Sequence, residues 1–121
     1  MAVVITEQTY SSVKKIKFEW TLSTGGAASG TSTKQYDGEV LRVVFGLTNF
    51  ASTGYAIVVN DEDGYDVLEG GGAVLTSGGG QLGVHDGKSP ISAVAESTLT
   101  FSLTSTGRSS TQAGECIVYI R

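Results

Sequence analysis

The sequence predicts an all-β fold: one domain, built as an antiparallel β-sandwich of jelly-roll-like type with about eight strands. Ser, Thr and Gly make up 45 of the 121 residues. They disfavour helices, because Ser and Thr divert backbone hydrogen bonds and Gly costs about 1 kcal/mol per helical position relative to Ala. Several short segments alternate apolar and polar side chains, as half-buried strands do. A chain of this length also buries roughly two-thirds of its unfolded surface, so its core needs no disulfide.

The N-terminal part predicts an arm followed by the clearest strand. Residues 1–12 are a possible N-terminal arm, with a short strand at 3–6. After it, Ile16, Phe18 and Trp20 alternate with polar residues, which places a large apolar face on one side of a strand. The basic cluster of Lys14, Lys15 and Lys17 lies among acidic residues, so we expect a solvated strand edge there.

The next segments predict a turn, a weak strand and a central strand. Small residues at 23–30 indicate a turn, and 31–36 is typical of a weak polar strand at a sheet edge. Asp37-Gly38 favours a two-residue type I′ turn. The run 39–47 is apolar on both faces near its end, which predicts a central strand.

The second half predicts a hairpin, a long loop and two closing strands. Residues 55–68 contain an apolar strand, an acidic Asp-Gly turn and a returning strand. Residues 69–95, with two glycine triplets, form a long Gly-rich region. Long loops are often functional or mobile, so this one either orders against a partner or is a mobile connection without a role. Alternation at 98–104 and the apolar run 115–120 predict the last strands.

Charge and hydropathy exclude two classes of partner. The net charge is −4 and the pI about 4.8, whereas phosphate binding needs clustered Lys and Arg, so we expect no nucleic acid. No run of 18 apolar residues occurs, and residues 1–7 lack the basic and apolar regions of a secretory signal. We therefore expect a soluble protein with no membrane partner.

Residues able to support catalysis are scarce. His85 is the single histidine, in a polar glycine-flanked loop, and no G-x-S-x-G motif surrounds a serine. We predict no enzyme activity, no catalytic residues and no cofactor. Cys116 cannot pair within the chain, and its apolar surroundings predict a small packed hydrophobe.

A calcium site is the more serious alternative. Asp61, Asp63 and Asp66 surround Gly64, and hard cations prefer clustered oxygen ligands. The EF-hand pattern fails, because its first and twelfth positions would be Val59 and Gly70. These three aspartates remain weak metal candidates beside the favoured interpretation, an acidic hairpin tip. Neither glycine triplet has the spacing of a phosphate-binding loop.

Protein contact is the remaining class of function. The segment Ala2, Val3, Val4, Ile5 is short, β-branched and uncharged, so it could add to the edge of another sheet. Val74 and Leu75, between the glycine triplets, are further interface candidates. We expect deletion of residues 1–7 to weaken such a contact while the fold stays intact.

Four segments resemble a family of short virion proteins of tailed bacteriophages, the capsid decoration or cement proteins. The matching stretches cover about a fifth of the chain: residues 15–21, 36–40, 60–68 and 117–121. The resemblance implies a homo-oligomer, a dimer or trimer, bound to the major capsid protein. It implies a location on the capsid surface of the virion, and in the host cytoplasm during assembly. Residues 69–95 match nothing in that family.

Two other functions stay open. One is a tail- or fibre-associated phage module that recognises a host surface ligand. The other is a calcium-dependent binding module that uses Asp61, Asp63 and Asp66.

Overall fold

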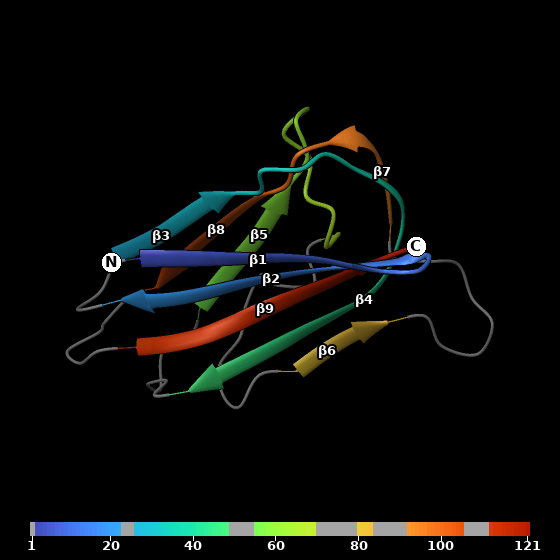
Figure 1. Ribbon diagram of the computed structural model, residues 1–121. Coiled ribbons are helices and arrows are strands. Elements are labelled where there is room, and N and C mark those ends of the chain that lie inside the picture. The colour runs from blue at the N-terminus through green and yellow to red at the C-terminus, as the bar shows by residue number, and fades with distance from the viewer. Residues whose placement is uncertain (1, 23–25, 49–54, 70–79, 84–91, 106–111) are drawn as a thin grey trace.

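The chain forms two antiparallel sheets packed face to face (Figure 1). The computed structural model describes residues 2–22, 26–48, 55–69, 80–83, 92–105 and 112–121. These residues contain nine strands and no helix, so the predicted antiparallel β-sandwich is confirmed. The strands are β1 (Ala2–Tyr10), β2 (Val13–Leu22), β3 (Gly26–Thr31), β4 (Tyr36–Thr48), β5 (Tyr55–Asn60), β6 (Gly80–Gly83), β7 (Ser92–Ser97), β8 (Thr100–Ser105) and β9 (Gln112–Ile120).

The two sheets are unequal in size. The larger has six strands in the order β1-β2-β9-β4-β6, with β7 also paired to β4. The smaller has three, in the order β3-β8-β5. Since β9 lies between β2 and β4, the last strand of the described chain is central in the larger sheet, as Figure 1 shows.

The core lies between the sheets and follows the period-two pattern of the sequence. Ile16, Phe18 and Trp20 point inward from β2, and all are at most 2% exposed. Phe101 of β8 meets two of them, with ring centroids 5.2 Å from Phe18 and 5.4 Å from Trp20. Offset aromatic pairs of this kind add about 0.5–1.5 kcal/mol beyond their burial. Cys116 is fully buried beside them, which confirms its prediction as a packed small hydrophobe.

The N-terminal segment is a full strand of the sheet, and its prediction as an arm is wrong. All nine residues of β1 pair with β2, from Ala2 opposite Thr21 to Tyr10 opposite Val13. Ser11 and Ser12 form the turn between them, with Ser11 at φ 54°. Consequently β2 is an inner strand, and its lysines do not mark a sheet edge as the sequence predicted.

The region around β3 and β4 also differs from prediction. Residues 26–31 form β3 and 32–35 a bend, whereas the alternation predicted the strand at 31–36. Small residues suit β3 because it lies beneath β1: a methyl group at Gly30 would come within 3.2 Å of side-chain atoms of Val3 and Ile5. Asp37-Gly38 lies inside β4, not in a hairpin turn. Gly38 has φ 129° and backbone of Arg121 beside it, which only glycine permits.

The predictions for the acidic hairpin and for the glycine-rich region are partly wrong. After β5 the chain turns through residues 61–65 and returns by a single bridge between Asn60 and Asp66, not by a second strand. Val67 and Leu68 then bury their side chains in the core. Within 69–95, residues 80–83 and 92–95 belong to β6 and β7, so the predicted continuous loop is wrong there.

Candidate functional site

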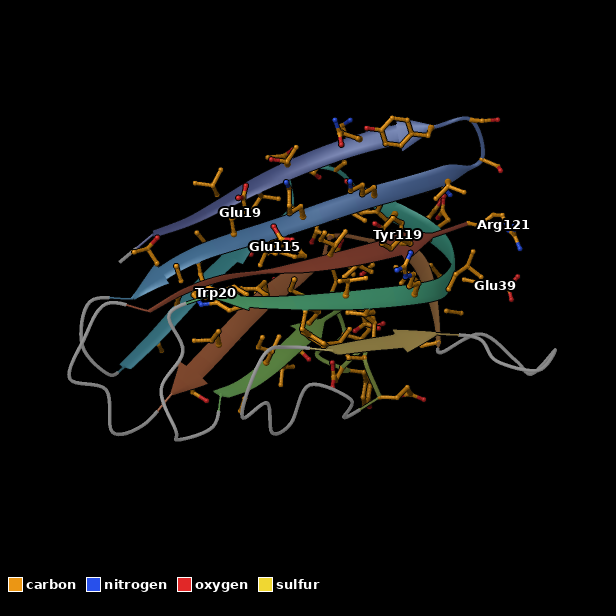
Figure 2. All side chains as sticks on the ribbon, turned by 90° about the horizontal axis from the view of Figure 1, so that it is seen from below. Glu19, Trp20, Glu39, Glu115, Tyr119 and Arg121 are labelled. Atoms are coloured by element: carbon orange, nitrogen blue, oxygen red, sulfur yellow. The ribbon has the colours of Figure 1, made fainter. Side chains whose placement is uncertain are left out.

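The predicted interface segment lies on β1, at the edge of the larger sheet. Val3 and Ile5 point inward and pack against the core, whereas Val4 points outward and is 59% exposed. In the described structure β1 pairs with β2 alone, so its other backbone edge faces away from the sheet (Figure 2). Residues 2–10 contain no Lys, Arg or Pro. Lys and Pro on an edge strand usually keep it from pairing with other chains, as do inward-pointing charges such as that of Glu7.

A half-buried carboxylate, Glu7, on the inward side of β1 fixes the strand in place. Glu7 Oε2 accepts hydrogen bonds from Thr33 Oγ1 at 2.6 Å and Thr33 N at 3.2 Å. Glu7 Oε1 accepts from Tyr36 Oη at 2.7 Å and Lys34 N at 3.1 Å. Both oxygens are thus fully engaged by the bend between β3 and β4. Hydrogen bonds to a charged group are worth about 1.5–3 kcal/mol each at most, so this cluster holds the edge strand firmly.

The same cluster shifts the pKa values of its two titratable groups. Partial burial raises the pKa of Glu7, but the hydrogen bonds from Thr33, Tyr36 and Lys34 outweigh it, so the pKa lies below 4.5. Burial, the hydrogen bond to Glu7 and the negative charge of Glu7 raise the pKa of Tyr36 well above its usual range. Glu7 is therefore charged and Tyr36 neutral at neutral pH, which is the combination the hydrogen bonds require.

A second carboxylate, Glu62, binds the same bend between β3 and β4. Glu62 Oε2 accepts from Thr98 N at 2.8 Å and Gln35 Nε2 at 3.2 Å, and these contacts lower its pKa. Glu62 N donates to the buried Ser97 Oγ at 2.7 Å. Both acidic groups thus bind loops to strands.

Two of the three metal candidates, Asp61 and Asp66, accept hydrogen bonds from nearby backbone N–H groups. Asp61 Oδ1 accepts from Asp63 N and Tyr65 N, each at 3.0 Å, which closes the turn. Asp66 Oδ1 accepts from Leu68 N at 3.0 Å and Val59 N at 3.2 Å. Across the described residues, no three His, Cys, Asp or Glu side chains are grouped so as to hold a metal ion. The aspartates act here as turn-forming residues.

The outward-facing side of β1, β2, β9 and β4 is called the outer face below. Directly opposed residues on neighbouring strands point to the same side, so the registers arrange the outer face in rows across the strands. The first row is Gln8, Lys15, Tyr119 and Arg42; the second is Thr6, Lys17, Ile117 and Val44; the third is Val4, Glu19, Glu115 and Gly46; the fourth includes Thr21 and Ala113.

Charge on the outer face changes sign between the second and third rows. The first two rows hold Lys15, Lys17 and Arg42, whose guanidinium carbon lies 5.5 Å from the centre of the Tyr119 ring. The third row places Glu19 directly opposite Glu115. Figure 2 shows these two glutamates side by side, with Tyr119 farther along β9. A methyl group at Gly46 would come within 3.1 Å of Glu115 Cγ, so Glu115 lies across β4.

The remaining candidates of the sequence are Val74, Leu75, His85 and Cys116. Val74 and Leu75, and with them His85, lie outside the described residues. Burial and the charge of Asp66 raise the pKa of the Cys116 thiol well above its usual range, so it is a poor nucleophile. Within the described residues, no helix is long and apolar enough to cross a membrane.

Comparisons with known proteins add little. No family model matches the sequence, and no curated protein does. A solved structure described as "Crystal Structure of FLHE" is similar with a TM-score of 0.45 and 14% identity, over 92% of this chain and 99% of that chain. A likeness this low carries no argument about function. The registers and burial define the class of this protein, a two-sheet antiparallel β-sandwich.

Sequence reasoning missed both the Glu7 cluster and the outer face. Glu7 and Thr33 are 26 residues apart, and nothing local marks a carboxylate as the acceptor for a distant bend. The outer face could have been found in part, because Lys15, Lys17 and Glu19 alternate with the core residues of β2. The partner strand β9, and with it Glu115, needed the register.

Proposed function

We propose that this protein is a non-enzymatic virion structural protein, a capsid decoration or cement protein that binds and stabilises the shell of the major capsid protein. The observation that carries the proposal is β1: nine residues long, anchored by Glu7, and without Lys, Arg or Pro along its open edge. Such an edge offers unpaired backbone groups to an extended segment of another protein. The resemblance of residues 15–21, 36–40, 60–68 and 117–121 to cement proteins supports the choice of partner.

The geometry is compatible with a non-enzymatic protein that binds and stabilises its partner. Glu7 and Glu62 are engaged in holding loops to strands, and the thiol is buried with a raised pKa. A decoration protein needs only a stable body and a contact surface. Many identical contacts on a closed lattice add, so each copy can contribute a modest interface.

Binding to purified shells tests the proposal. Protein added to undecorated capsids should bind to saturation and raise the temperature at which the shell is disrupted. Absence of both effects would remove the proposal, and binding to isolated tails instead would favour the tail-associated alternative.

A matched pair of substitutions tests the edge. V4K places a charge at an exposed position of β1 and should weaken shell binding at least tenfold, because charged side chains on an edge strand oppose strand addition. T104K adds the same charge at an exposed position of β8, which lies between β3 and β5. T104K should bind as the wild type does. Equal binding by V4K would show that shell contact does not use β1.

A further inference from the structure

The opposed glutamates of the outer face lack a cation within the described structure. Like charges directly opposite each other on a sheet are destabilising. Neither the Glu19 nor the Glu115 side chain forms an ion pair or hydrogen bond with any residue that the structure describes. Glu19 is exposed and Glu115 half-buried. This pair costs stability in the isolated chain, and a positive charge brought by a partner would relieve it.

The outer face itself carries that positive charge one row away. Lys17 lies two residues before Glu19 on β2, and Lys15 lies one row farther. A two-fold axis that runs across the strands, between the second and third rows, exchanges the basic and acidic halves. It places Lys17 of one copy opposite Glu19 of the other, and Glu19 opposite Lys17. An axis parallel to the strands would instead place like charges together.

We propose that the outer face is a self-association surface, through which two copies of this chain pack face to face with their strands antiparallel. The occupant is a second copy because this rotation pairs Lys17 with Glu19 in both directions, while Glu115 of each copy faces Ile117 of the other. The proposal rests on the homo-oligomer that the proposed function includes, and it adds the surface and the symmetry.

The arrangement leaves the open edge of β1 available. An axis across the strands keeps each strand above its own counterpart, so both β1 edges lie on the same side of the pair. A dimer built this way presents two identical edges in one direction, as a protein bound to a shell at a two-fold position would.

The area of the outer face determines how tightly two copies are expected to associate. Four strands spaced by about 4.8 Å, over nine residues at about 3.3 Å each, give a face of roughly 20 by 30 Å. This is below the roughly 800 Å² per partner of a standard stable interface. The dimer therefore belongs to the weak class, and self-association has to be measured up to about 1 mM protein.

Charge reversal tests the proposal by sedimentation equilibrium. K17E and E19K should each weaken self-association at least tenfold, because each places like charges opposite one another. An equimolar mixture of K17E and E19K should associate at least as well as the wild type. In the mixed dimer, each contact between position 17 of one copy and position 19 of the other joins Lys to Glu. The double variant K17E/E19K, which keeps the net charge of −4, should also dimerise.

Sedimentation equilibrium of two control variants shows whether the effect is specific to the outer face. K34E and E69K make the same charge changes at exposed positions away from the outer face, and neither they nor their mixture should alter association. Circular dichroism checks that each variant is folded. A wild type that stays monomeric up to about 1 mM, or an oligomer that K17E and E19K leave unchanged, would overturn the proposal. If the wild type binds shells but stays monomeric, the proposed function is supported and self-association through the outer face is not.

Discussion

The packing of this sandwich depends on particular side chains at particular positions more than on whether a residue is polar or apolar. Glu7 is a charged residue facing the interior, and it is tolerated because four donors from residues 33–36 surround its two oxygens. Gly114 is a second case. A methyl group there would lie 2.5 Å from Trp20 Cζ2 and 2.7 Å from Gly46 O, so the absence of a side chain is a packing requirement.

E7Q should lower the free energy of unfolding at neutral pH by about 1–3 kcal/mol, because an amide replaces the charged acceptor of four donors. The folded pKa of Glu7 lies below 4.5, so its contribution is present above pH 4.5 and is lost as the pH falls through the folded pKa. Urea unfolding at several pH values should show the two proteins converging in acid. A difference that is independent of pH would contradict this assignment.

G114A should destabilise the protein by about 1–3 kcal/mol, since the added methyl group overlaps the Trp20 ring and a backbone oxygen. G46A is the matched control on the neighbouring strand. There the methyl group meets only the flexible side chain of Glu115, which can move aside. Thermal unfolding compares the two variants, and an equal loss in both would disprove the packing argument.

At the scale of elements, β1 belongs to the body of the sandwich. It contributes Val3 and Ile5 to the core, pairs along its whole length with β2, and packs on β3 at Gly30. An arm can be removed without loss of the fold, but an edge strand that covers core residues cannot.

Deletion of residues 1–7 should therefore destabilise the fold by at least about 3 kcal/mol, through lost burial of two aliphatic side chains and loss of the Glu7 cluster. This replaces the expectation that the fold survives such a deletion intact. Chemical denaturation of the truncated chain measures the loss. Wild-type stability after truncation would show that β1 is a dispensable arm after all.

At the scale of the whole molecule, the sequence predicts local alternation well and long-range pairing poorly. Phe18 and Phe101 show their inward direction through neighbours two residues away, so both central strands could be predicted. By contrast β3 is built from small residues whose role is to make room for Val3 and Ile5, and no local pattern reveals that. Asp37-Gly38 has hairpin chemistry, yet the approach of Arg121 backbone decides its conformation.

The rate at which Cys116 reacts with a thiol reagent measures global unfolding of the sandwich. Its side chain is fully buried between the sheets, and its pKa is raised. Reaction with a thiol reagent should therefore require global unfolding, and its rate should rise with denaturant in parallel with the unfolding constant. Rapid labelling in buffer, with the fold intact by circular dichroism, would contradict a core placed between the two sheets.

The most direct measurement of the proposed role is the copy number of this chain in purified virions, by quantitative mass spectrometry against the major capsid protein. A decoration protein should be present in numbers comparable with the major capsid protein. A count that is a small fraction of it, at the level of a tail component, or absence from the virion would contradict the account.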